Sequence, residues 1–318
     1  MGGRRVTWSP DPDAFLGDLE AKPAALRSLA PRLEADPWPE VESTDRTVFV
    51  GMGSSRFAAL PVAAMLRANG RDVVVERASA VAVAPAALGT LAVAISASGT
   101  TPETLAALAR HRDGGSTTVA ITNAEGSGLA EVAEHHISLG AGEETGGVAC
   151  RSFQHTIAVL LAMLDARRAA DAARRAADAT EDLLDRRASW LPQAADVVGD
   201  TGRVFVLAPD ERISSAEQGA LMFREGPRVA ADACETGDWL HVDVYLTKPL
   251  DYRAVRFAGS RFDDDVARWI DERGGRLLSV GPVAGGVRYR GDDDPDVALL
   301  AETLVPELVA ADVWRRQA

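Results

Sequence analysis

Cysteine and lysine are both scarce in this chain of 318 residues. The two cysteines, Cys150 and Cys234, provide neither a disulfide framework nor a metal-ligand spacing. The only lysines are Lys22 and Lys248, so arginine supplies nearly all the positive charge, and no basic cluster is evident. Because the formal net charge is −13, we do not expect the chain to bind nucleic acid.

Long apolar runs are also missing. No stretch approaches the roughly 18 apolar residues that a membrane span needs, so we expect no membrane partner. Residues 1–8 carry charge with no apolar core behind them, which predicts no secretory signal and a cytoplasmic location. With 47% hydrophobic and 25% charged residues, the chain can form one large or two medium domains.

Along the first half of the chain, apolar runs typical of buried strands alternate with segments of helical periodicity. This order predicts a parallel sheet covered by helices on both faces. A single helix is expected over residues 12–35, where apolar residues recur at helical spacing around Pro23. The other expected elements are strands at 47–50, 73–76, 91–96 and 118–122, and helices at 55–68, 102–111 and within 152–190.

An internal match predicts a second copy of the same α/β unit. Residues 203–206, Arg-Val-Phe-Val, resemble residues 47–50, Thr-Val-Phe-Val, at an offset of 203 − 47 = 156. At this offset three more pairs are alike: Gly226 with Gly70, Val229 with Val73, and Asp232 with Glu76. Duplication of one unit explains the match, and chance likeness between strand–helix–strand stretches is the alternative.

We therefore divide the chain into an N-terminal helical segment (1–45), a first domain with linker helices (46–195) and a second domain (196–318). A strand at 277–280 and a final helix near 296–312 complete the second copy. The fold class is α/β with two parallel-sheet units in tandem.

Two of the apolar runs end abruptly in glycine and hydroxyl residues and then become helical. The first run leads into Gly53, Ser54 and Ser55, and the second into Ser96, Ser98 and Thr101. Helix N-termini offer unpaired N–H groups and a positive dipole end, to which hydroxyls add donors. The two loops together predict a phosphate site, although ordinary helix capping would explain either one alone.

The residues around the second loop fit a helix start. Thr101 suits the N-cap and Pro102 the first helical position. The first loop of the second copy, residues 207–210 (Leu-Ala-Pro-Asp), lacks such hydroxyls. We therefore expect one ligand site per chain.

With these motifs the chain resembles the sugar isomerase (SIS) superfamily in a tandem arrangement. It is most similar to the isomerase domain of glucosamine-6-phosphate synthase and to stand-alone phosphosugar isomerases and deaminases. Besides the two loops, the resemblance depends on residues 145–149 (Thr-Gly-Gly-Val-Ala), 217–225 and 237–241. It covers about residues 12–312 and implies doubly wound, flavodoxin-like units.

The resemblance implies that a hexose 6-phosphate is bound by Ser96, Ser98, Thr101 and the loop of Gly53, Ser54 and Ser55. It implies that Glu225 moves a proton between C1 and C2 of the open-chain sugar. His241 would open the sugar ring and would be supplied across a homodimer interface, so that the active sites are shared. The separation of the two residues, 241 − 225 = 16, agrees with the family's spacing.

These residue types suit the chemistry. A carboxylate in a partly apolar site has a raised pKa and can remove a weakly acidic proton beside a carbonyl. An imidazole can protonate a ring oxygen near neutral pH. We predict no metal site, because the neighbours His135 and His136 lie on opposite sides of an expected strand with no third ligand, and we predict no cofactor.

The chain also departs from the synthase. It has no glutaminase domain with a terminal nucleophilic cysteine, so we expect free ammonia wherever nitrogen is involved. No lysine follows Lys248, so an iminium route through a tail lysine is not expected, and residues 238–243 replace the family's commoner ring-opening pattern.

The sequence thus predicts an aldose–ketose isomerase or an amino-sugar deaminase acting on a hexose 6-phosphate. Phosphoglucose or phosphomannose isomerisation is the alternative reaction. A non-catalytic sugar-phosphate-binding regulator is the alternative of another class, although the sequence shows no helix-turn-helix segment before the first copy and its net charge is negative.

Overall fold

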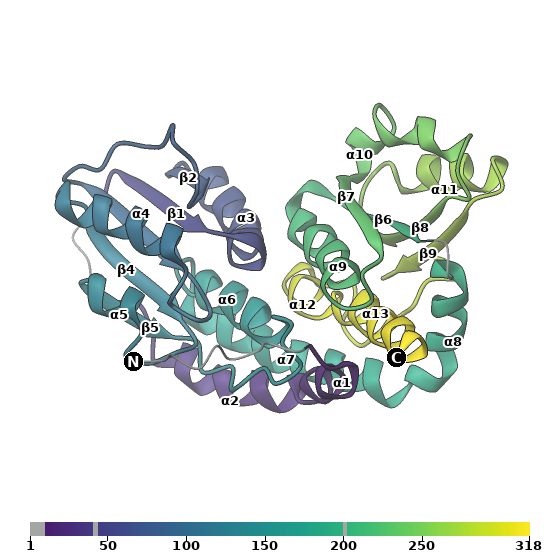
Figure 1. Cartoon of the computed structure of the whole chain (residues 1–318), viewed down its shortest axis with the longest axis horizontal. Coiled ribbons are helices and arrows are strands. Elements are labelled where there is room, and N and C mark those ends of the chain that lie inside the picture. The colour runs from purple at the N-terminus through teal and green to yellow at the C-terminus, as the bar shows by residue number, and fades with distance from the viewer. Residues whose placement is uncertain (1–9, 41–43, 200–201) are drawn as a thin grey trace, which may run out of the picture.

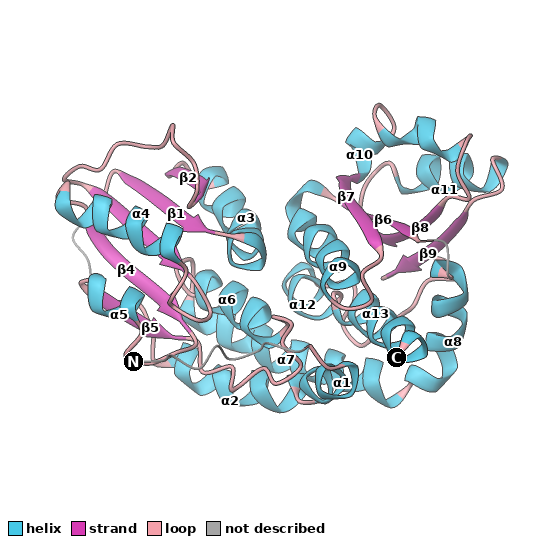
Figure 2. Cartoon of the chain, viewed as in Figure 1, coloured by secondary structure: helices cyan, strands magenta, loops and turns pink. Residues whose placement is uncertain are grey.

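The computed structural model describes residues 10–40, 44–199 and 202–318, and these form two parallel β-sheets with helices packed around them (Figures 1 and 2). Residues 1–8, from which we predicted no secretory signal, lie outside the described residues. None of the described helices has the length and apolar character needed to cross a membrane.

The first sheet has the strand order β2-β1-β3-β4-β5, and all its neighbouring strands are parallel. This is the flavodoxin-like doubly wound order that the resemblance implied. Its six-residue strand β3 is buried throughout, as expected for a parallel sheet covered on both faces. The elements are β1 (Arg46–Gly51), α3 (Gly53–Ala68), β2 (Asp72–Arg77), β3 (Thr90–Ile95), α4 (Pro102–Asp113), β4 (Thr117–Thr122), α5 (Gly128–Val132) and β5 (His135–Ser138).

The second sheet has the order β7-β6-β8-β9, again parallel, and so repeats the first four positions of the first sheet. The prediction of two tandem α/β units is confirmed. The elements are β6 (Arg203–Ala208), η1 (Asp210–Arg212), α9 (Ile213–Glu225), β7 (Ala230–Glu235), α10 (Thr236–Trp239), η2 (Asp243–Thr247), β8 (Arg253–Phe257), α11 (Asp263–Glu272) and β9 (Arg276–Val280).

The two copies are not related by one constant offset. Arg46 of β1 pairs with Asp72, 26 residues later, whereas Arg203 of β6 pairs with Ala230, 27 residues later. The second copy therefore has one extra residue in the turn before β7. The expected correspondence of Gly226 with Gly70 is wrong: Gly70 has a positive φ of 80°, and the positive φ before β7 belongs to Arg228, at 60°.

The helix expected over residues 12–35 is two helices, α1 (Pro12–Glu20) and α2 (Lys22–Glu34), which meet at Ala21. Pro23 has no N–H to donate to the preceding turn, so the helical hydrogen bonds are interrupted there. The single helix expected near 296–312 is likewise two helices. The remaining helices are α6 (Arg151–Leu161), α7 (Ala166–Asp185), α8 (Arg187–Val198), α12 (Pro295–Ala301) and α13 (Leu304–Gln317).

Helices from both ends of the chain join the two units. Figure 1 shows the sheets at opposite ends of the molecule, with α2, α7 and α13 between and below them. One apolar cluster includes residues of both sheets and of these helices. Lys22 of α2 and Glu307 of α13 are fully buried and form an ion pair in this region. The units therefore share a core, although each has its own sheet.

Candidate active site

The loop after β3 gathers three of the expected phosphate-binding hydroxyls. Ser96 is buried, and its Oγ accepts a hydrogen bond from the Gly99 amide and lies 3.1 Å from Thr101 Oγ1. Ser98 is exposed, and its Oγ accepts hydrogen bonds from the amide and hydroxyl of Thr100. These bonds hold the hydroxyls in a compact turn at the start of α4.

Thr101 is the N-cap residue of α4 and Pro102 is its first helical residue, as expected. The side chain of Thr101 does not cap the helix, however, because its hydroxyl contacts Ser96 instead. An N-terminus without a side-chain cap keeps its N–H groups available to a bound anion.

The loop after β1 lies beside this turn. Gly51, the last residue of β1, pairs with Ile95, the last residue of β3, so the chain leaves both strands at one edge of the sheet. Gly53 adopts a positive φ of 49°, and Ser54 and Ser55 are partly exposed in the first turn of α3. Successive connections diverge between β1 and β3, and ligands of doubly wound folds bind at such a switch point.

Arg56 adds positive charge next to these serines. Burial and the nearby Arg77 guanidinium lower the pKa of Arg56, while Glu217 of the second unit acts in the opposite direction. Two neighbouring guanidinium groups repel each other, so a bound anion between or beside them would be stabilised. Sequence analysis did not identify Arg56, since an arginine in a helical segment has no distinctive local signal.

A third loop at this edge, residues 143–150, is fixed by buried charges. Glu144 accepts hydrogen bonds from the amides of Cys150, Arg151 and Ser152 and from the Ser152 hydroxyl, so it caps α6. Asp18 of α1 accepts hydrogen bonds from the Gly146 amide and from Arg151. The sequence motif 145–149 is therefore held in place by residues that sequence analysis missed. An acidic residue shortly before a helix start is the signal that could have identified Glu144.

The second unit reaches this loop through α9, which packs against α3 (Figure 1). Gln218 is buried, and its Nε2 donates a 2.8 Å hydrogen bond to the Ala149 carbonyl. Glu225 follows Gln218 by seven residues, which is two helical turns or about 10 Å along the same helix face. The helix face that carries Glu225 is thus the one that contacts the first unit.

Glu225 itself is half-buried at the end of α9. Burial raises the pKa of its carboxyl, and Arg228 and Arg224 lower it to a smaller extent. A carboxylate with a raised pKa is a better proton acceptor than an exposed one, which suits a general base.

His241 is exposed, after the short helix α10. Glu225 comes before β7 and His241 comes after it, and a six-residue strand spans roughly 17–20 Å. The two expected catalytic residues therefore lie at opposite ends of one strand within a single chain. In residues 10–40, 44–199 and 202–318 no group of three or more histidine, cysteine or acidic side chains could hold a metal.

Residues 40–166, which contain both hydroxyl loops and the loop around Gly146, match the SIS domain family. This part of the chain is similar to a SIS domain. The SIS resemblance inferred from the sequence is thereby confirmed, and the second sheet repeats the strand order of the first over four positions.

Curated proteins similar to this chain include two enzymes named glutamine–fructose-6-phosphate aminotransferase (isomerizing). The one from Thermococcus kodakarensis is 27% identical over 261 residues, with 76% of this chain and 43% of the relative covered. The one from Arabidopsis thaliana is 26% identical over 279 residues, with 82% and 40% covered. The chain thus spans less than half the length of these relatives.

Solved structures share the fold over nearly the whole chain. The C-terminal domain of glucosamine-fructose-6-phosphate aminotransferase from Francisella tularensis superimposes with a TM-score of 0.77 at 19% identity, with 93% of this chain and 95% of that chain covered. Glucosamine-6-phosphate deaminase from Thermotoga maritima gives 0.72 at 18% identity, with 96% and 95% covered. Tagatose-6-phosphate ketose/aldose isomerase from Escherichia coli gives 0.72 at 17% identity, with 95% of both chains covered.

Proposed function

We propose that this chain interconverts an aldose and a ketose 6-phosphate, or deaminates the corresponding amino sugar, through the open-chain form. The observation that carries the proposal is the pair of hydroxyl loops that flank the β1–β3 switch point. Their helix N-termini, together with Arg56, favour a phosphate there. Solved structures with the same fold include a deaminase and a ketose/aldose isomerase, whose names support the deamination and the isomerisation proposals respectively.

In the proposed reaction, the Ser54–Ser55 and Ser96–Thr101 loops hold the phosphate. The Glu225 carboxylate removes the proton from the carbon next to the carbonyl, and the electron pair of that C–H bond moves toward the carbonyl oxygen. An enediolate results. The remaining hydroxyl proton passes to the former carbonyl oxygen, and delivery of a proton from Glu225 to the other carbon gives the isomer. The raised pKa of Glu225 suits it to accept and return this proton.

We propose further that the protein acts as a homodimer with shared sites. Since Glu225 and His241 lie at opposite ends of β7, one chain does not bring both to one sugar. His241 of a second copy would therefore complete each site and open the ring. The division into three segments and the cytoplasmic location stay predictions from the sequence.

An NMR assay in D₂O tests the reaction. A panel of hexose 6-phosphates and amino-hexose 6-phosphates is incubated with the protein, with and without ammonium. We expect deuterium at C1 or C2 together with a new isomer or released ammonia. Tight binding without exchange or turnover would instead establish a non-catalytic sugar-phosphate-binding regulator. Exchange confined to glucose or mannose 6-phosphate and fructose 6-phosphate would identify a phosphoglucose or phosphomannose isomerase.

A mixing experiment tests the shared site. Light scattering should give twice 33.6 kDa. The Glu225→Gln and His241→Asn homodimers should each turn over slowly. A mixed dimer should have one intact site, which takes Glu225 from the His241→Asn chain and His241 from the Glu225→Gln chain. Mixed dimers that stay as slow as the parents would show that the two residues do not serve one sugar across an interface.

A further inference from the structure

The turns before β2 and β7 occupy the same place in the two units but contain different residues at the strained position. At the end of α3, the Arg71 amide donates to the Leu66 carbonyl, and Gly70 takes the positive φ. At the end of α9 the turn is one residue longer: the Val229 amide donates to the Phe223 carbonyl, and Arg228 takes the positive φ.

Glycine is the usual residue in such a turn because it has no Cβ to clash in the left-handed region. An arginine there strains the backbone. Among the residues that the structure describes, the Arg228 side chain forms no hydrogen bond or close ion pair, and it is exposed. Its charge acts on Glu225, whose pKa it lowers. Strained residues of this kind concentrate at functional sites.

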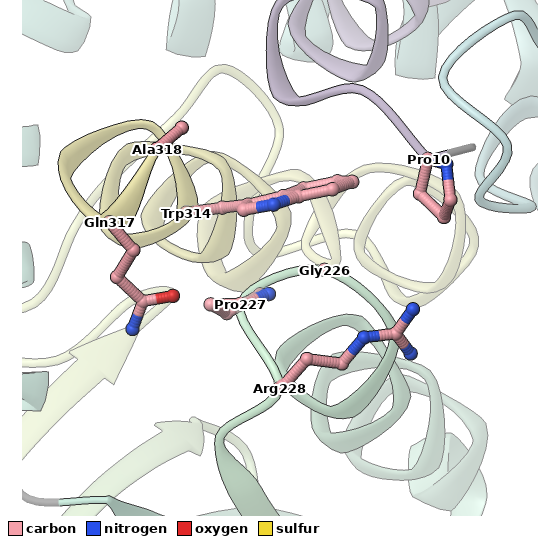
Figure 3. Close-up of a pocket in the computed structure, with 7 residues that line it drawn as sticks. All are labelled: Pro10, Gly226, Pro227, Arg228, Trp314, Gln317 and Ala318. Atoms are coloured by element: carbon pink, nitrogen blue, oxygen red, sulfur yellow. The ribbon is translucent and has the colours of Figure 1, made fainter.

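Arg228 also lines a pocket of about 320 Å³. Its lining includes Gly226 and Pro227, which directly follow Glu225 in the sequence. Figure 3 shows the indole of Trp314 and the side chain of Arg228 on either side of the Gly226–Pro227 turn, with Pro10 toward one end and Gln317 toward the other. The pocket thus combines a cation, an aromatic wall and an amide.

Packing connects this pocket to the loop around Gly146. The Trp314 ring lies 6.1 Å from the Phe15 ring, centroid to centroid. A Cβ on Gly146 would meet the Phe15 backbone at 2.3 Å, so the loop lies directly on Phe15. On the other side, a Cβ on Gly226 would meet the Trp314 ring at 3.1 Å. Trp314 therefore contacts both the turn after Glu225 and the helix that supports this loop.

We propose that Arg228 is a substrate-binding residue of the site that Glu225 serves, and that its guanidinium binds the oxygen atoms at the carbonyl end of the open-chain sugar. The inference rests on the proposed function. When the proton leaves for Glu225, the C–H electron pair places negative charge on the former carbonyl oxygen. The N–H groups of Arg228 donate to this oxygen and stabilise the enediolate. Isomerisation needs no further reactant, because Glu225 returns a proton to the sugar after exchange with solvent. Deamination also consumes one water molecule, which hydrolyses the imine formed on proton return and so releases ammonia.

Replacement of Arg228 by glycine separates this role from a structural one. Arg228→Gly relieves the backbone strain, so we expect the melting temperature to rise by about 1–2 °C. In the same variant kcat/KM and the rate of deuterium exchange should fall by on the order of 10²-fold. Arg228→Lys should recover part of the rate, because it keeps the charge but loses the planar fork. Arg71→Ala, in the equivalent turn of the first unit, is the matched charge control and should behave as wild type.

Each other outcome is decisive. Arg228→Gly with wild-type turnover and wild-type affinity for fructose 6-phosphate would overturn the inference and leave the proposed function standing. A fall in melting temperature would also overturn it, since Arg228 would then hold the fold. A wild-type chain that binds fructose 6-phosphate or glucosamine 6-phosphate without turnover would remove the proposed reaction alone; calorimetry on Arg228→Gly would then show weaker binding if the inference holds. A wild-type chain that binds neither sugar removes both.

Discussion

The two units of this chain have the same parallel strand order over four positions but differ in the chemistry of their loops. After β1 and β3 of the first unit come the serines and threonine of the hydroxyl loops, with Arg56 nearby. After β6 and β8 of the second unit comes a pocket of about 460 Å³ whose charged lining residues are Asp210, Glu211, Glu235 and Arg261, three acidic and one basic. The first edge is the proposed anion site, and the three acidic residues at the second edge disfavour an anion there.

Strand order therefore determines where a site can form, and the residues of the loops determine its charge. The two units also contribute different parts of the candidate site. The first unit contains the proposed phosphate-binding loops. Helix α9 of the second unit, which carries Gln218 and Glu225, packs against the first unit in the same region. If this description is right, equivalent substitutions in the two units will have unequal effects.

The largest expected difference is in turnover, between variants of Glu225 in the proposed site and of Glu211 in the second unit. Glu225→Gln should slow turnover by on the order of 10²–10⁴-fold while sugar-phosphate affinity stays nearly unchanged, because a general base is lost. Deuterium exchange at C2 measures this. Because burial raises the pKa of Glu225 above its ordinary 4.5, activity should be lost as pH falls through that raised value. Glu211→Gln, at the pocket of the second unit, is the control; an equal loss there would contradict these different contributions of the two units.

The shared core predicts that the units unfold together. Lys22→Met leaves the carboxylate of Glu307 buried without its partner and should cost about 3–5 kcal/mol in the free energy of unfolding. The double variant Lys22→Met, Glu307→Leu should recover much of this. Arg27→Met, which breaks exposed ion pairs with Asp178 and Glu181, should cost far less than Lys22→Met, because solvent screens both pairs. Denaturant titration followed by circular dichroism should show one transition, and two separate transitions would mean independent units.

Serines at equivalent strand ends should differ in ligand binding. Ser98→Ala removes a hydroxyl from the proposed phosphate seat and should weaken fructose 6-phosphate binding by about 1.5–3 kcal/mol, since the lost hydrogen bond is to a charged acceptor. Ser260→Ala, in the loop after β8, should leave affinity as in wild type. Calorimetric titration compares them. Equal affinities in the two variants would remove the phosphate assignment.

The smallest effect is expected in the first-unit turn. Gly70→Arg places an arginine at the positive-φ position of the first unit, as Arg228 occupies that position in the second. The backbone strain should cost about 1–2 kcal/mol, because φ is 80° and a Cβ meets no other atom within 4 Å. Turnover should be unchanged. Thermal unfolding and the isomerase assay measure the two effects, and a loss of turnover would show that this turn also contributes to the site.

Much of the first unit could be predicted because its signals are local. The strand β3 is a run of six buried residues, and the hydroxyl cluster follows it directly. The strand β8 escaped prediction although all five of its residues are buried. Arg253 and Arg256 interrupt its apolar pattern. Each donates hydrogen bonds to distant partners, Arg253 to the Val197 carbonyl and Arg256 to the Ser279 hydroxyl. A buried arginine can be recognised only when its partners are known.

The candidate site shows the same limit. Sequence order gives the 16-residue separation of Glu225 and His241, but only the structure shows that β7 keeps them apart. The hydroxyl of Thr101 suits a helix cap by sequence, yet in the fold it contacts Ser96. Both outcomes depend on the path of the chain between the residues.

By itself, the sequence determined the two parallel-sheet units and the hydroxyl loops, because apolar periodicity and strand-to-helix transitions depend on neighbouring residues. The choice of Glu225 as the proposed base came from the family resemblance. Tertiary structure alone decided that Gln218 contacts Ala149, 69 residues away, and that one extra residue puts Arg228 in the left-handed turn beside Glu225. The Gln218–Ala149 contact and the position of Arg228 depend on how separate elements pack and on the lengths of the connecting turns. No local sequence pattern predicts either.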